Sequence, residues 1–113
     1  MYEYDATVVK VYDGDTITVT VKLGFGVYKT EKLRLSGINA PELRGDERPY
    51  GLVSRGKLRE LILDQDIIIK TYKDKKGKYG RYIADIYFKN PETGVFCVND
   101  WLVENKLAVY KKY

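Results

Sequence analysis

The chain has 113 residues, of which 44% are hydrophobic and 32% charged, and its formal net charge is +4. This length allows one hydrophobic core, so we expect a single domain over residues 1–113. There is no histidine and there is one cysteine, which excludes a histidine-dependent hydrolytic triad, an imidazole zinc site and an intramolecular disulfide. Catalysis must therefore use carboxylates, Lys, Arg, Tyr or a hard metal ion.

The sequence shows neither a membrane-spanning segment nor a signal peptide. Its apolar runs are only a few residues long, far below the ~20 residues that cross a bilayer. The first ten residues contain Glu3 and Asp5 and no basic segment followed by an apolar stretch. We expect no membrane partner, whereas a cytoplasmic location and export with a removed presequence both stay open.

The first part of the chain predicts three consecutive strands. Residues Ile17–Leu23 alternate between apolar and polar, which is the period of a half-buried strand. Residues Ala6–Tyr12 are rich in β-branched side chains and are followed by an Asp-Gly turn, so the two runs should form an antiparallel hairpin. After a Gly-Phe-Gly break, Val27–Leu35 supplies a third strand. Three sequential strands form a meander.

The rest of the chain predicts two helices and further strands. Apolar residues at helical spacing indicate an amphipathic helix over Tyr50–Leu63. The remaining expected elements are strands at Ile67–Tyr72, Tyr82–Phe88 and Val95–Cys97, and a helix over Asp100–Lys106 with Asn99 as its N-cap. This order predicts a mainly β (α+β) fold, an OB-fold five-stranded Greek-key barrel with flanking α-helices.

Positive charge is concentrated in residues 70–81. This segment carries six basic residues and one acidic residue, and Tyr72 and Tyr79 lie between the charges. Cations displace counterions from phosphates and aromatic rings stack on bases, so the segment suits a nucleic acid. A solvated, lysine-rich hairpin loop explains the same composition.

Two candidate sites lie in the first three strands. The turn Asp13-Gly14-Asp15-Thr16 offers two carboxylates and a hydroxyl, and such oxygen ligands suit a hard cation such as Ca²⁺. An ordinary Asp-Gly turn is the alternative. Arg34 lies between two leucines, so the pleat should turn its guanidinium away from the core, free to hold an anion. An exposed strand arginine is the alternative.

Two further candidates follow the third strand. The proline in Asn39-Ala40-Pro41-Glu42 makes Ala40 extended, which could present an amide oxygen, a backbone carbonyl and a carboxylate in one loop. A polar turn is the alternative. Arg81 ends the basic segment, where it is either a second anion ligand or one more surface charge. Hydrolysis of a phosphodiester needs such a set together: a metal, two guanidiniums and a carboxylate that acts on water.

The motifs together resemble the staphylococcal nuclease (thermonuclease) family of calcium-dependent nucleases. The resemblance covers nearly the whole chain and keeps the family's order and spacing. It rests on DGDT at 13–16, RLSGINAPE at 34–42, YG at 50–51, KYGR at 78–81 and VNDWLVENKLA at 98–108.

The resemblance implies a role for each matching residue. Asp15 corresponds to the main Ca²⁺ ligand, and the positions of Asn39 and Ala40 also face the metal. Arg34 and Arg81 match phosphate clamps, and Glu42 matches the residue that acts on the attacking water. Members cleave DNA and RNA with little sequence preference and leave 3′-phosphate ends. The substrate-binding positions are Lys78 and Tyr79, which match the family, and Lys75 and Lys76 of the basic segment.

One departure from the family pattern concerns the metal. Asn39 stands where the family has a second metal-binding aspartate, which keeps an oxygen ligand but removes a negative charge. Because ligand charge tunes calcium affinity, this change should weaken Ca²⁺ binding.

Three hypotheses follow. The leading one is a monomeric Ca²⁺-dependent nuclease whose substrate is DNA or RNA. The second is an OB-fold nucleic-acid-binding module that Asn39 has left catalytically weak or inactive. The third is a protein-interaction barrel, which would bind nucleic acid without salt dependence or not at all.

Overall fold

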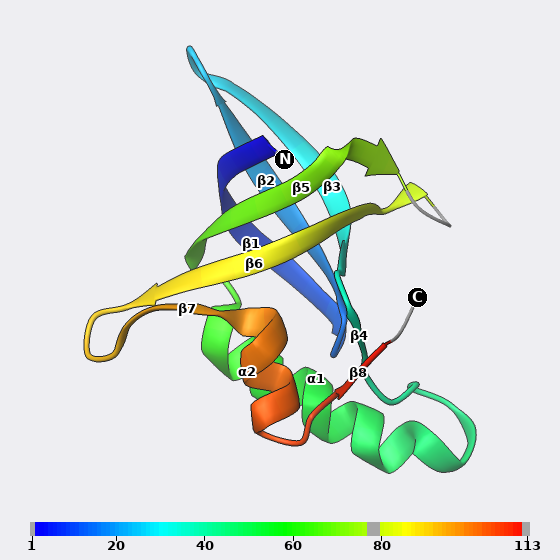
Figure 1. Cartoon of the computed structure of the whole chain (residues 1–113). Coiled ribbons are helices and arrows are strands. Elements are labelled where there is room, and N and C mark those ends of the chain that lie inside the picture. Colours follow the sequence, from blue (N-terminus) through cyan, green and yellow to red (C-terminus); the bar gives the residue numbers. More distant parts are fainter. Residues whose placement is uncertain (1, 77–79, 112–113) are drawn as a thin grey trace.

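Five strands close into a barrel in the computed structural model (Figure 1), which describes residues 2–76 and 80–111, with side chains outside 73–79. Neighbouring strands follow the order β3-β2-β1-β5-β6, and a parallel pairing of β3 with β6 closes the ring. The mainly β, OB-type barrel is therefore confirmed. The barrel strands are β1 (Tyr2–Asp13), β2 (Thr16–Gly24), β3 (Val27–Leu35), β5 (Asp66–Lys76) and β6 (Tyr82–Asn90).

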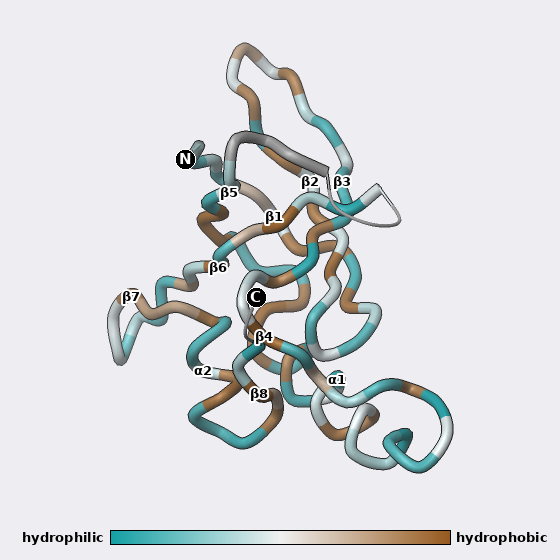
Figure 2. Tube along the Cα trace, turned by 45° about the vertical axis from the view of Figure 1, so that its right-hand side comes forward, coloured by the Kyte–Doolittle hydropathy of each residue, from teal (hydrophilic) through white to brown (hydrophobic). Residues whose placement is uncertain are grey.

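The barrel interior comes from the alternating side chains of the strands. On β2, Ile17, Val19 and Val21 are buried, as the period of the sequence predicted, and Figure 2 shows the change of hydropathy along the chain. The hairpin of β1 and β2 and the meander with β3 are confirmed. β1 begins earlier than predicted, because Tyr2–Thr7 also pair with β5.

Two helices cover one end of the barrel (Figure 1). After a 3₁₀ turn, η1 (Gly45–Glu47), helix α1 spans Arg48–Ile62, and its buried face includes Leu58 and Ile62 at helical spacing. Strand β7 (Gly94–Cys97) extends the sheet from β6, and α2 spans Val98–Glu104. None of the helices in the described part of the chain is long and apolar enough to cross a membrane.

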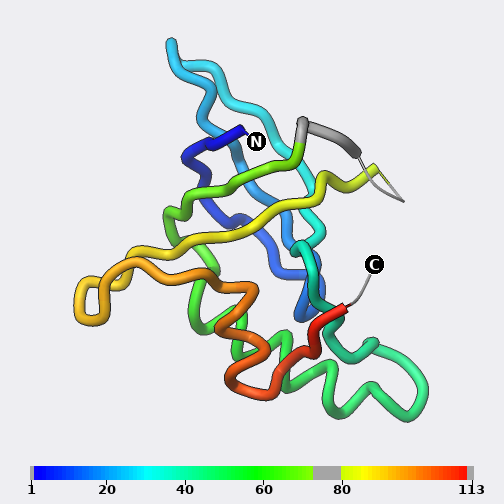
Figure 3. The backbone as a smooth tube through the Cα atoms, in the orientation of Figure 1, coloured from blue at the N-terminus to red at the C-terminus, as the bar shows by residue number. Residues whose placement is uncertain are grey.

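A second, two-stranded sheet ties the C-terminal segment to the loop after β3. Strand β4 (Ile38–Asn39) pairs with β8 (Val109–Tyr110), and the N–H of Lys111 donates to the carbonyl of Gly37 at 2.8 Å. The two segments lie side by side in Figure 3, although they are far apart in the sequence. This pairing was not predicted, and it holds residues 37–39 of the loop.

The predicted N-cap Asn99 is wrong, because α2 begins at Val98 and Asn99 lies inside it. Its side chain is buried and bonds the barrel instead. The Oδ1 atom accepts from the N–H of Ile86 (3.0 Å), and Nδ2 donates to the carbonyls of Ser36 (2.9 Å) and Ala84 (3.2 Å). The amide of Asn99 thus fastens α2 to β6 and to the end of β3.

Replacing Asn99 with alanine should lower the free energy of unfolding by about 2–4 kcal/mol, because it leaves buried backbone groups without partners. Urea unfolding followed by circular dichroism measures this change. Asn105→Ala is the matched control, since the Nδ2 of Asn105 donates to the Trp101 carbonyl at an exposed position. Equal small losses in both variants would show that Asn99 does not fasten the helix.

Candidate active site

The turn between β1 and β2 places Asp15 against the barrel wall. The N–H of Asp15 donates to Oδ1 of Asp13 at 2.9 Å, which is the turn role considered for Asp13. Burial, together with the hydrogen bond to Asp15 and its negative charge, raises the pKa of Asp13 to about 6. The turn therefore disfavours a second negative charge beside Asp15.

The carboxylate of Asp15 is almost buried and is bonded from three sides. Its Oδ1 accepts from the hydroxyl of Thr16 (3.2 Å), and its Oδ2 accepts from the N–H of Ala40 (2.8 Å). The same Oδ2 lies 3.4 Å from Nη2 of Arg34. These contacts fix the orientation of the carboxylate before any ligand arrives.

Arg34 joins the loop after β3 to this carboxylate. Its neighbours Leu33 and Leu35 are buried, so its side chain lies on the outer wall, as predicted. The Nη1 atom donates to the carbonyl of Leu35 (2.8 Å), and Nη2 donates to Oδ1 of Asn39 (2.6 Å). Asn39 and Asp15 thus present oxygens to one guanidinium.

Arg81 directly precedes β6, the strand that pairs with β3 to close the barrel. Its Nη1 donates to Oγ1 of Thr16 at 3.1 Å, and Thr16 in turn bonds Asp15. The structure therefore brings Arg34 to the Asp15 carboxylate directly and Arg81 to it through the Thr16 hydroxyl, although the two arginines are far apart in the sequence. The sequence suggested the Thr16 hydroxyl only as an oxygen ligand in the DGDT turn, whereas in the structure it links the two arginines.

Two glycines let the loop that carries Asn39 and Glu42 approach its neighbours. A Cβ on Gly14 would lie 2.6 Å from the Cβ of Ala40. A Cβ on Gly51 of α1 would contact the backbone carbonyl oxygen of Glu42 and lie 2.9 Å from its carbonyl carbon. The loop therefore packs between the β1–β2 turn and α1, in space that a side chain at Gly14 or Gly51 would occupy.

Glu42 pairs with a neighbour in its own loop. Its carboxylate pairs with Nε of Arg44 at 3.0 Å, and the side chain is 58% exposed. Among the described residues, no hydrogen bond or ion pair joins Glu42 to Asp15 or Arg34. The predicted Lys75 and Lys76 end β5 with side chains outside the described ones, and Lys78 and Tyr79 lie outside the described residues.

The oxygen donors of the cluster can be compared with what a hard cation requires. Asp15 and Asn39 contribute oxygens that contact the same nitrogen of Arg34, so these oxygens lie close together. Oxygen donors are the ligands that Ca²⁺ prefers, and affinity rises with the number of carboxylates. Within the described residues, no group of three or more Asp, Glu, Cys or His side chains is placed to bind a metal. The donors fit a weakly held hard cation.

Comparisons with known proteins point to one family. The family model for staphylococcal nuclease homologues matches residues 32–113. The chain is 30% identical over 107 residues to an uncharacterized endonuclease of Haemophilus influenzae, covering 94% of this chain and 52% of that protein. It is also 30% identical over 109 residues to a thermonuclease of Staphylococcus hyicus, covering 94% of this chain and 59% of that protein.

A shorter match is to a probable staphylococcal-like nuclease of Oryza sativa, with 41% identity over 59 residues, which is 52% of this chain and 14% of the plant protein. The matched segments thus span between 14% and 59% of the length of these relatives. With the closed barrel and the paired arginines, the family match leads to one conclusion: the chain belongs to the family of staphylococcal nuclease homologues.

Proposed function

We propose that the chain is a monomeric, Ca²⁺-dependent nuclease that hydrolyses phosphodiester bonds of single-stranded DNA and RNA. It cleaves with little sequence preference and leaves 3′-phosphate ends. The observation that supports this most is the convergence of Arg34 and Arg81 on the Asp15–Thr16 pair from the two strands that close the barrel.

The two arginines bind the scissile phosphate. A guanidinium donates paired hydrogen bonds to phosphate oxygens, and two of them neutralise the charge that grows in the transition state. Arg34 is already held by the Leu35 carbonyl and Asn39, so little reorganisation is needed when the phosphate arrives.

Asp15 would hold a Ca²⁺ ion, with Asn39 and the backbone carbonyl of Ala40 as further ligands. Bound there, the ion would supply Lewis-acid polarisation of a phosphoryl oxygen. The Thr16 hydroxyl and the Ala40 N–H keep the Asp15 carboxylate in one orientation.

Glu42 acts on the attacking water, either as the base that takes its proton or as the group that orients it. Its exposed carboxylate exchanges the Arg44 partner for that water when substrate is bound. The lysines and tyrosine of the basic segment, Lys75, Lys76, Lys78 and Tyr79, bind the strand on either side of the cleaved bond.

The test is cleavage of a fluorescent single-stranded DNA by the purified chain with added Ca²⁺, beside an EDTA control and a Glu42→Gln variant. We expect cleavage that both EDTA and the variant abolish, and phosphatase-sensitive 3′ ends on the products. Glu47→Gln in η1 is the matched control and should cleave like the wild type. Binding of intact DNA without cleavage at any Ca²⁺ concentration would overturn the proposal.

A nucleic-acid-binding OB module is the second candidate. The observation that favours it is the bond from Arg34 to Asn39, which places a cation beside the oxygens that would hold Ca²⁺. Such a module binds single strands without cleaving them.

Under either function, a Lys75→Gln/Lys76→Gln variant should bind single-stranded DNA with a weaker salt dependence. The slope of log K against log salt concentration should be smaller by about 1.4, since each phosphate contact contributes about 0.7. An unchanged slope would remove these two lysines from the interface.

Asn39→Asp should lower the Ca²⁺ concentration for half-maximal cleavage by about tenfold, because a second carboxylate raises the affinity of an oxygen site. Calcium titration of the cleavage rate measures this. Asn105→Asp makes the same charge change at an exposed position away from the cluster and should leave the titration unchanged. An equal Ca²⁺ requirement in Asn39→Asp and the wild type would show that Asn39 is not a ligand.

A further inference from the structure

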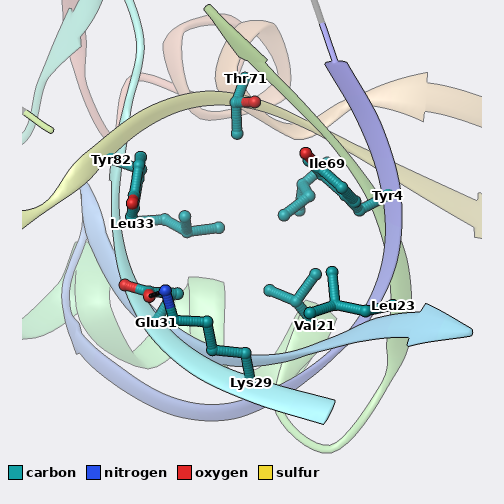
Figure 4. A pocket seen from close by; sticks show the side chains of 9 residues that line it. All are labelled: Tyr4, Val21, Leu23, Lys29, Glu31, Leu33, Ile69, Thr71 and Tyr82. Carbon is teal, nitrogen blue, oxygen red and sulfur yellow. Dashed lines mark ion pairs between the residues drawn. The ribbon is translucent and has the colours of Figure 1, made fainter. Parts of the chain in front are cut away.

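The end of the barrel away from the helices is open and holds a cavity of about 190 Å³ (Figure 4). Its floor is apolar, since Leu33, Ile69 and Val21 are buried there. Tyr4 and Tyr82 face each other across the opening. This cavity is smaller than the roughly 300–1,000 Å³ of pockets that enclose a drug-sized ligand, so it suits one planar ring system rather than a whole nucleotide.

One side of the cavity carries a charged pair, and Thr71 and the two tyrosines add hydroxyl groups to the wall. The side chain of Glu31 is only 13% exposed, and its Oε1 lies 2.8 Å from Nζ of Lys29, which is 59% exposed at the rim. Within the described residues, this ion pair is the polar contact that the Glu31 side chain makes. A carboxylate and an ammonium therefore lie side by side at the cavity wall, facing an apolar floor.

We propose that this cavity binds one unpaired guanine base of the strand whose phosphate lies at Arg34 and Arg81. The proposal rests on the proposed function and adds a base-specific contact to an otherwise tolerant substrate site. The occupant is a base of single-stranded DNA or RNA, because a paired base is held in its helix and does not expose this edge.

The edge of guanine matches the charged pair group by group. Guanine presents the carbonyl oxygen O6 and then two adjacent donors, N1–H and the 2-amino group. The Glu31 carboxylate accepts from the two donors and the Lys29 ammonium donates to O6. Adenine, cytosine, thymine and uracil do not present two adjacent donors on this edge, so each offers the Glu31 carboxylate at most one hydrogen bond there instead of two.

The walls of the cavity support a base rather than a smaller polar ligand. Unstacked bases are held by aromatic side chains and by hydrogen bonds to their pairing edge. The rings of Tyr4 and Tyr82 supply such faces on opposite sides, and the apolar floor accepts the rest of the ring system. Stacking on an aromatic ring contributes about 1–3 kcal/mol per base.

The cavity and the phosphate site share one seam of the barrel. Leu33 on β3 pairs with Tyr82 on β6, and both line the cavity. Arg34 follows Leu33 about 3.3 Å further along β3, and Arg81 directly precedes Tyr82, the first residue of β6. Because the two strands are parallel, the two arginines flank this pair on opposite sides along the line where β3 meets β6. A strand held by the two arginines on the outer wall therefore passes the rim of the cavity, where a neighbouring base can enter.

The experiment uses the metal-free protein, so that binding is measured without cleavage. Methyl resonances of Val21, Leu33 and Ile69 are followed by NMR while guanosine 5′-monophosphate is added, and inosine 5′-monophosphate, which lacks the 2-amino group, is the matched probe. We expect the guanine nucleotide to shift these methyl groups and to bind about tenfold more tightly than the inosine nucleotide, in line with one good bidentate contact to a base edge.

Two variants test the recognition itself. Glu31→Gln should reduce the guanine-to-inosine ratio to about one, while Glu92→Gln, an exposed glutamate in the turn before β7, should keep it. Tyr4→Leu keeps an apolar wall and should weaken both nucleotides alike. Unmoved methyl groups, or an equal ratio in the wild type and Glu31→Gln, would overturn the proposal. A chain that binds guanine here but cleaves no strand supports the cavity and refutes the nuclease function.

Discussion

Arg34→Lys should reduce kcat for single-stranded DNA by about 10²–10³-fold, the loss seen when one preorganised donor to a developing charge is removed. Lysine keeps the positive charge but not the planar fork that bonds the Leu35 carbonyl and Asn39 at the same time. Its ammonium therefore reaches the phosphate without a fixed geometry. Steady-state cleavage at saturating Ca²⁺ measures the effect.

The matched control for this prediction is Arg48→Lys. Arg48 also donates to a backbone carbonyl, that of Leu43 at 2.8 Å, but it lies at the start of α1 and outside the Asp15 cluster. Its replacement should leave kcat within about twofold, as expected of a surface substitution away from the site. Wild-type turnover in Arg34→Lys, with both variants folded, would remove the Arg34 fork from the mechanism.

Gly51→Ala should lower kcat by about 10²-fold, because a misplacement of about 1 Å in a reacting group has this effect. The new methyl group meets the backbone of Glu42 and Pro41, which cannot yield as a flexible side chain does, so the loop must shift. Overpacking of this kind also destabilises by about 1–3 kcal/mol. Cleavage kinetics and thermal unfolding measure the two effects separately.

Gly56→Ala in the same helix is the control that distinguishes an effect on the loop from an effect on the helix. A Cβ on Gly56 meets nothing within 4 Å, so this variant should gain about 0.5–1 kcal/mol of stability from helix propensity and keep its activity. If Gly51 acts by positioning Glu42, adding Gly51→Ala to a Glu42→Gln background should cause little further loss of kcat. A full second loss in the double variant would show that Gly51 acts through another group.

The sequence predicted the barrel strands in which apolar and polar residues alternate regularly. It missed the two-residue strands and the long-range side-chain contacts, which leave no such pattern. The alternation in Ile17–Leu23 defines β2 because a period of two extends over seven residues. Strands β4 and β8 have two residues each, too few to show any period. Asn99 stood where an N-cap is common, but the backbone groups that bind it lie on β6 and beside β3, and no local pattern reports such contacts.

The candidate site was predicted as a set of residues and not as an arrangement. The outward direction of Arg34 followed from its two leucine neighbours. Its bonds to Asp15 and Asn39, and the link from Arg81 through Thr16, depend on closure of the barrel between β3 and β6. The ion pair of Glu42 with Arg44 depends on the course of the loop. The sequence thus identified the candidate site residues, and the fold shows which of them lie close together.

The pairing of β4 with β8 has a consequence for the nascent protein. A chain whose synthesis has reached Arg81 already contains each arginine and carboxylate proposed for cleavage. Yet β4, which includes Asn39, gains its partner strand only when Val109 and Tyr110 have emerged, and Lys111 then adds its bond to Gly37. Long-range pairings of this kind form late, because the loop between them must first be closed. A chain that has emerged only as far as Arg81 therefore lacks the partner strand that orders the loop around Asn39, and activity should arise only after residues 109–111 have also emerged.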